Sequence, residues 1–135
     1  MRLTWAEHLS VGNGLIDSDH QKLIVVVNDM EHAIGTKDHA GLTKAFDLFT
    51  THMLIHFINE EKIAAAINFP FVQIKQERLQ FGHLIKYLNP DNALWAKDLV
   101  GYVEFLSDWM LDRIMREDMQ MKSALETYPY NFKPD

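Results

Sequence analysis

A histidine and a glutamate four residues apart, His56 and Glu60, are the pair in this chain best suited to chemistry. They lie in a helix-prone segment from Gly41 to Ile67. Because an α-helix turns by about 100° per residue, side chains four residues apart share one face. The apolar residues of that face are Leu42, Phe46, Phe49, Met53, Ile63 and Ile67. An unpaired charge in such a core costs several kcal/mol, so Glu60 needs a metal ion, a cationic side chain or a proton as its partner.

The composition limits the classes of partner and of chemistry. The 135-residue chain has a formal net charge of −6 and no long basic run, so we expect no binding to nucleic acid or to a membrane. It has no cysteine, which excludes disulfides and thiolate ligands. No signal-like apolar stretch is apparent at its start, so we expect a cytoplasmic protein. No Ser-His-Asp arrangement, glycine-rich phosphate loop or cysteine nucleophile is apparent either, and we predict that the protein is not an enzyme.

Hydrophobic periodicity predicts four helices, at roughly 18–35, 38–67, 71–88 and 93–125. Asp17 or Ser18 is expected to cap the first helix, and Thr36 or Asp38 the second. An irregular N-terminal arm precedes them. Because short connections make neighbouring helices antiparallel, the predicted fold class is all-α. It is an up-down-up-down antiparallel four-helix bundle that forms one domain over residues 1–135.

Three groups of residues together form a recognisable pattern. They are Trp5 with Leu9-Ser10-Val11-Gly12 and Ile16-Asp17-Ser18-Asp19-His20; His56-Phe57 with Glu60-Glu61 and Phe69-Pro70; and Trp109-Met110-Leu111 with Asp118. In order and spacing this pattern resembles the bacterial hemerythrins, oxygen-binding four-helix bundles with a non-haem di-iron centre. The resemblance extends over nearly the whole chain. It implies a hemerythrin-like fold, with O2 or another small molecule as the ligand.

Carried over position by position, the resemblance implies the ligands of one iron and the two carboxylates that bridge both irons. The ligands of the first iron correspond to His20 and His56. The bridging carboxylates correspond to Glu60 and Asp118. These four residues are therefore the predicted metal ligands.

The histidines that hold the second iron in the family are all replaced. Their positions carry Lys75, Leu79 and Arg113 in this chain. Lys75 and Arg113 supply two positive charges, and a guanidinium can bind a carboxylate through two parallel hydrogen bonds. Leu79 is expected to fill the volume of an imidazole. We therefore expect a buried salt-bridge cluster to replace at least half of the metal centre.

Three functions remain open from the sequence. The favoured one is a metal-free pseudo-hemerythrin that binds no cofactor and acts as a binding or regulatory module, for instance through a protein partner. The second is a protein that binds one iron or other divalent metal ion at the four retained residues and senses oxygen, nitric oxide or redox state. The third is a di-iron oxygen carrier with substitute ligands, for which His52 and His83 are the nearest histidines. The sequence indicates neither the roles of His52 and His83 nor the oligomeric state.

Overall fold

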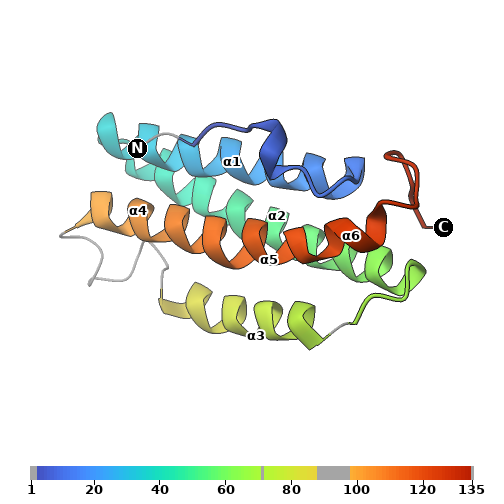
Figure 1. Cartoon of the computed structure of the whole chain (residues 1–135). Coiled ribbons are helices and arrows are strands. Elements are labelled where there is room, and N and C mark those ends of the chain that lie inside the picture. Colours follow the sequence, from blue (N-terminus) through green and yellow to red (C-terminus); the bar gives the residue numbers. More distant parts are fainter. Residues whose placement is uncertain (1–2, 71, 88–97, 135) are drawn as a thin grey trace.

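In the computed structural model of the protein, the described residues form four rods of helix (Figure 1). The described structure covers residues 3–70, 72–87 and 98–134, without the side chains of Gln73, Tyr87, Leu99, Arg113 and Ile114. The first three rods are α1 (Gly14–Gly35), α2 (His39–Ala66) and α3 (Val72–Tyr87). The fourth rod consists of α4 (Leu99–Trp109), η2 (Met110–Met115), α5 (Arg116–Asp118), η3 (Met119–Met121) and α6 (Lys122–Leu125).

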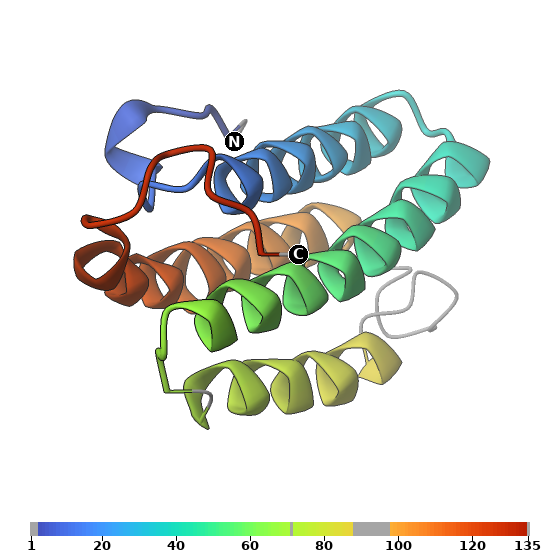
Figure 2. The same cartoon turned by 90° about the vertical axis from the view of Figure 1, so that its right-hand side faces the viewer.

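The rods alternate in direction and pack side by side, as the two views of Figures 1 and 2 show. The predicted all-α, hemerythrin-like bundle is thus confirmed. A 3-10 turn, η1 (Glu7–Leu9), lies in the N-terminal arm. The predicted fourth helix included residues 93–97, which lie outside the described residues, and the rod as described begins at Leu99 behind the N-cap Asp98.

The first helix begins earlier than predicted because a different residue caps it. Asn13 Oδ1 accepts hydrogen bonds from the backbone N–H groups of Leu15 and Ile16, at 3.0 and 3.2 Å. These bonds satisfy donors that a helix leaves unpaired in its first turn, so the helix extends back to Gly14. The second helix is capped by Asp38, as predicted.

Asp17, predicted as a cap, lies instead inside the first turn and joins both chain ends to the bundle. Its buried carboxylate accepts hydrogen bonds from the Ser10 hydroxyl, the Val11 backbone N–H and the Tyr130 hydroxyl. A carboxylate with three donors is well satisfied despite its burial. The N-terminal arm and the C-terminal tail are therefore held against the same end of α1 (Figure 2).

The buried side chains form two apolar clusters with a polar layer between them. The larger cluster includes Leu23, Phe57, Phe81 and Met115, and the smaller includes Ile16, Ile63, Ile74 and Met121. Each rod passes from one cluster to the other and places a buried polar residue at the crossing. Those residues are His20 in α1, His56 and Glu60 in α2, Glu77 in α3 and Asp118 in α5.

The fourth rod changes its winding where it approaches this layer. Its segment Met110–Met115 is a π-helix. A π-helix bonds residues five apart, so Met110 and Met115 can face the core together, and both are buried. Such turns are frequent at functional sites. This one ends three residues before Asp118.

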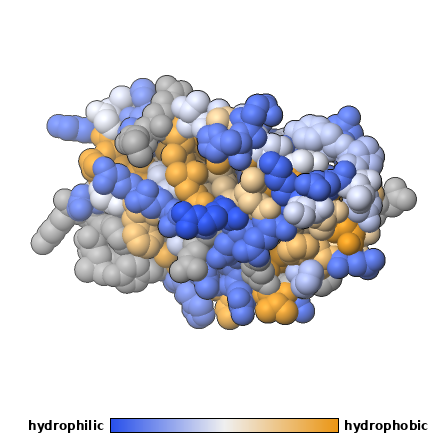
Figure 3. All heavy atoms as spheres, in the orientation of Figure 1, coloured by the Kyte–Doolittle hydropathy of each residue, from blue (hydrophilic) through white to orange (hydrophobic). Residues whose placement is uncertain are grey.

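The outer surface mixes polar and apolar side chains, and Figure 3 shows this on one face. Large apolar side chains are exposed on several rods, among them Val25, Leu54, Ile58, Val72, Leu79 and Val100. Over the part of the chain that the structure describes, no helix has both the length and the apolar character needed to cross a bilayer.

Candidate metal centre

Two buried imidazoles face each other across α1 and α2. His20 and His56 are both fully buried, and their ring centroids are 4.8 Å apart. Each lies in the apolar stripe of its helix, as the sequence predicts, so the burial of the neighbouring apolar residues holds it inward. The two rings are placed to act on a common group.

Asp118 is that common group. Its Oδ2 atom lies 2.8 Å from His20 Nε2 and 2.9 Å from His56 Nε2. Burial lowers the pKa of His20 to about 3, and the charge of His56 acts in the same direction. Burial alone would lower the pKa of His56 as well, but the charge and hydrogen bond of Asp118 outweigh it and raise that pKa well above the usual value. The two imidazoles are therefore shifted in opposite directions: the pKa of His56 toward the protonated form and the pKa of His20 toward the neutral form.

Glu60 is the second residue that α2 places in the candidate centre, after His56. Its Oε2 atom lies 3.2 Å from His56 Nε2, and its carboxyl group is fully buried. Burial, and secondly the negative charge of Asp118, raise the pKa of Glu60 to about 8. Its Oε1 atom and the Oδ1 atom of Asp118 have no hydrogen-bond partner among the described atoms. The carboxyl group therefore carries a proton at neutral pH unless a cation takes the place of that proton.

Asp19 contacts the side of the His56 ring that faces away from Asp118. The sequence did not predict this contact. Its Oδ2 atom lies 3.5 Å from His56 Nδ1 and accepts a 2.9 Å hydrogen bond from the Asn59 amide. Burial would raise the pKa of Asp19, but the contacts with His56 and Asn59 together lower it. A carboxylate on the far nitrogen of a histidine fixes the direction of the near nitrogen, which here points to Asp118.

The third helix contributes Glu77 in place of the residues expected from the resemblance. Glu77 is 1% exposed, whereas Lys75 is exposed and Leu79 is 65% exposed. The expectation that Leu79 fills the space of an imidazole is therefore wrong, and Lys75 does not supply a buried charge. The reason is the rotation of α3, which buries Ile74 and Phe81 and with them the glutamate between them.

The sequence contained a signal for Glu77. It lies three residues after Ile74 and four before Phe81, the same relation to an apolar stripe that singled out Glu60. The side chain of Arg113, the third replacement, lies outside the described residues. The histidines offered as substitutes are half-buried in the case of His52 and exposed in the case of His83.

The possible ligand atoms fall into two overlapping groups. His20, His56 and Asp118 form one, and Glu60, Glu77 and Asp118 form the other; within each group the ligand atoms lie within 4.8 Å of one another. Imidazole nitrogens and carboxylate oxygens are suitable ligands for divalent iron or manganese. The buried, unpartnered oxygens of Glu60 and Asp118 give a cation places to bind. The donor set therefore fits a divalent metal ion, although it is richer in carboxylate than the set that the resemblance implies.

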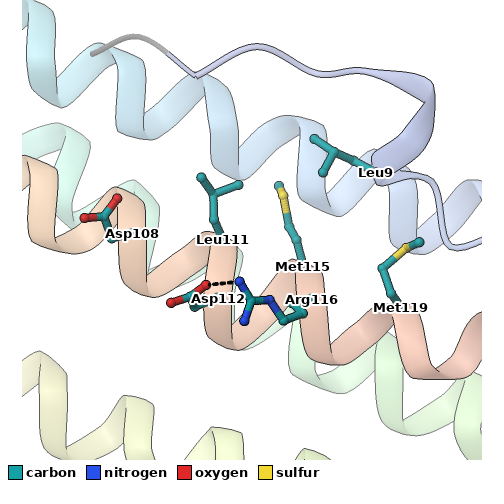
Figure 4. Close-up of a pocket in the computed structure, with 7 residues that line it drawn as sticks. All are labelled: Leu9, Asp108, Leu111, Asp112, Met115, Arg116 and Met119. Carbon is teal, nitrogen blue, oxygen red and sulfur yellow. Dashed lines mark ion pairs between the residues drawn. The ribbon is translucent and has the colours of Figure 1, made fainter.

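One surface pocket lies near the centre but does not open onto the candidate ligands. It has a volume of about 430 Å³ and lies between η1 and the fourth rod (Figure 4). Its lining residues are Leu9, Asp108, Leu111, Asp112, Met115, Arg116 and Met119. Its rim carries an ion pair of 2.8 Å between Arg116 and Asp112. None of the five candidate ligand side chains lines it, so the centre is closed on this side.

Each of the four rods thus contributes at least one buried histidine or carboxyl group to the same layer, an arrangement suited to a helical cation-binding domain. The family model described as Hemerythrin HHE cation binding domain matches residues 11–125. The chain therefore belongs to the hemerythrin family, for which binding of iron and of O2 is characteristic.

Curated relatives match over a shorter stretch. Proteins named Bacteriohemerythrin from Pseudomonas aeruginosa and Stenotrophomonas maltophilia are 26% identical over 69 residues, which is 51% of this chain and 45% of each relative. The matched part thus spans about half the length of these proteins. No solved structure matches the chain significantly.

Proposed function

We propose that this chain binds a divalent metal ion, first of all iron, at His20, His56 and Asp118. The proposal is supported by the convergence of both Nε2 atoms on one oxygen of Asp118, at 2.8 and 2.9 Å. Two imidazoles and one carboxylate are the ligands of mononuclear non-haem Fe(II) centres. Membership of a cation-binding family adds independent support.

The residues that surround the proposed metal ligands suit the binding of a small molecule at the metal. An iron ion held by these residues would bind a molecule such as O2 or nitric oxide. Asp19 orients His56, and the apolar clusters on both sides keep water away. We propose binding or sensing of such a molecule, rather than catalysis, in a cytoplasmic protein.

The test is the iron content of the purified chain. Metal-free protein is incubated with Fe(II) without oxygen, freed of unbound metal, and measured by elemental analysis. The wild type is expected to retain at least one iron per chain, and His56→Ala to lose about 90% of it, in line with loss of a direct ligand. The matched control is His52→Ala, one turn earlier on α2 and outside both ligand groups. Wild-type protein without iron, or His56→Ala with unchanged iron, would refute the proposal.

A second candidate is a metal-free binding or regulatory module, and the hydrogen bonds favour it. Asp118 already bridges both imidazoles, and the raised pKa values of His56 and Glu60 mean that protons can neutralise part of the negative charge. Arg113 offers a further positive charge in the sequence.

This candidate predicts that a chelator changes neither the metal content nor the melting temperature of the purified protein. It also predicts that Arg113→Ala costs about 2–5 kcal/mol of stability, because a buried carboxylate loses its partner. The control is Arg116→Ala, whose side chain is 77% exposed. Equal stability of the two variants would contradict the candidate.

A further inference from the structure

The outer side of α3 is both apolar and positively charged. Its cationic side chains are Lys75, Arg78 and Lys86, whereas the one acidic residue of that helix, Glu77, is buried. Leu79 lies among the cations and is 65% exposed. A groove of about 420 Å³ runs along this side of the helix. Its lining residues are Lys75, Arg78, Leu79, Gly82, His83 and Lys86. The helix thus presents a basic groove in a chain whose net charge is −6.

Exposed apolar residues of α2 extend this groove. Arg78 pairs with Glu61 of α2 at 2.9 Å and lies 5.8 Å from the ring centroid of Phe57, which holds the two helices side by side. Leu54 and Ile58 precede Glu61 by seven and three residues and therefore lie on the same side of α2. They are 49% and 50% exposed. We call the groove with these two side chains the basic face. Apolar side chains gathered within a polar rim are typical of a protein-binding surface.

A surface of the opposite charge lies on the fourth rod. Glu104 and Asp108 of α4 and Asp112 of η2 follow one another at intervals of four residues, and all three are exposed. At that spacing they form a stripe along one side of the rod. Val100 and Phe105 lie next to this stripe and are 59% and 46% exposed. We call these five residues the acidic face. It combines exposed apolar side chains with negative charge, as the basic face combines them with positive charge.

The two faces complement each other in length as well as in charge. The cations extend from Lys75 to Lys86 and the acids from Glu104 to Asp112, which at 1.5 Å per helical residue is about 16 Å and about 12 Å. An exposed ion pair contributes little by itself, so the apolar side chains of both faces must supply much of the binding free energy. The charges decide which surfaces meet, because the basic face repels a copy of itself and attracts the acidic face.

We propose that the basic face of one copy of this chain binds the acidic face of a second copy. Because the two faces are different surfaces of one molecule, the contact is head to tail rather than two-fold symmetric. The inference goes beyond metal binding and does not depend on it, since none of the candidate metal ligands belongs to either face.

The experiment measures self-association of the full-length protein by sedimentation velocity over a wide range of protein concentration, at low and at physiological salt. The first variant combines Lys75→Glu with Lys86→Glu, so that both of its faces are acidic. The second combines Glu104→Lys with Asp108→Lys, so that both of its faces are basic. All four side chains are exposed, and circular dichroism confirms that each variant is folded.

The matched control combines Lys22→Glu with Lys133→Glu. Both lysines are exposed and belong to neither face, and this variant has the same net charge as the first one. Leu79→Ser is a milder variant, which removes an apolar side chain from the basic face without a change of charge.

The wild type and the control are expected to associate, and more strongly at low salt. Each charge-reversed variant alone should bind itself at least about tenfold more weakly, because like charges then meet across the contact. Leu79→Ser should also weaken association. An equimolar mixture of the two charge-reversed variants should associate again, because each supplies the face that the other lacks.

A wild type that stays monomeric at high concentration and low salt would mean that a different protein covers the basic face, and would overturn the inference. Undiminished association of the second variant would mean that the acidic face takes no part, as in a symmetric contact, and would also overturn it. A mixture that stays monomeric would show that the two faces do not bind each other. The iron content of the wild type decides the proposed function separately, whichever of these results is found.

Discussion

Replacing Glu60 with glutamine removes one buried charge with almost no change of shape. The carboxyl group is fully buried, and its pKa of about 8 means that it is protonated in the metal-free protein at pH 6.5. The amide of glutamine resembles that protonated group. The wild type at pH 6.5 must take up a proton on folding, because the unfolded glutamate, with a pKa of 4.5, is ionised at this pH. Glutamine avoids that cost, so the metal-free Glu60→Gln protein should be more stable than the wild type at pH 6.5, by up to about 3 kcal/mol.

The effect of pH follows from the direction of the shift. The pKa of Glu60 is raised from 4.5 to about 8, so folding favours the protonated form. Its contribution to stability is complete below the unfolded pKa and is lost as the pH rises through about 8. At pH 9 the metal-free Glu60→Gln protein should therefore be more stable than the wild type.

Added metal should favour the wild type over Glu60→Gln, the reverse of the order expected without metal. A metal ion at 100 times its dissociation constant stabilises the folded wild type by about 2.7 kcal/mol. For a domain of this size that corresponds to a rise in melting temperature of about 10 °C. Glu60→Gln, lacking a ligand oxygen, should show a much smaller rise, whereas Glu61→Gln should behave as the wild type.

The assay is thermal unfolding followed by circular dichroism, with chelator or with Mn²⁺, at pH 6.5 and pH 9. A full metal-induced rise in Glu60→Gln would show that Glu60 is not a ligand. A loss of several kcal/mol in its metal-free form at pH 6.5 would show that Glu60 is ionised there and held by a cation, against the reasoning above. A loss in Glu61→Gln of more than about 1 kcal/mol would also count against it, because an exposed ion pair contributes no more than that.

Three further predictions concern the pH dependence of binding, the core and the tail. Because the pKa values of His56 and Glu60 are raised, a metal ion must displace their protons, and the affinity for metal should increase from pH 6 to pH 8. Calorimetry in two buffers should detect the released protons, and a metal affinity that does not change with pH would contradict this. Phe81→Ala, at a side chain only 2% exposed, should cost about 3–5 kcal/mol in urea unfolding, and a cost below 1 kcal/mol would mean that α3 is not packed as described. Tyr130→Phe, which loses the 2.9 Å bond to Asp17, should cost about 1 kcal/mol and speed proteolysis of the tail, whereas unchanged cleavage would show that this bond does not hold it.

The sequence did not predict which face of α3 is buried. Its apolar residues support two faces, one through Val72 and Leu79 and the other through Ile74 and Phe81. Periodicity alone does not choose between faces that both repeat every seven residues. Packing selects Ile74 and Phe81, which touch the two apolar clusters, and Val72 and Leu79 are 66% and 65% exposed. That choice decided which acidic residue of α3 faces the polar layer.

The sequence by itself determined the all-α bundle and the inward positions of His20, His56 and Glu60, because each lies in an apolar stripe. The position of Asp118 followed only from the family resemblance, and the structure buries it as well. Only the tertiary structure decided what surrounds them. Contacts between rods depend on the rotation of each helix about its axis, which local spacing does not fix. That rotation brought Glu77 to the other carboxylates and left Lys75 outside. The pair His56 and Glu60 therefore lies at the junction of an imidazole group and a carboxylate group.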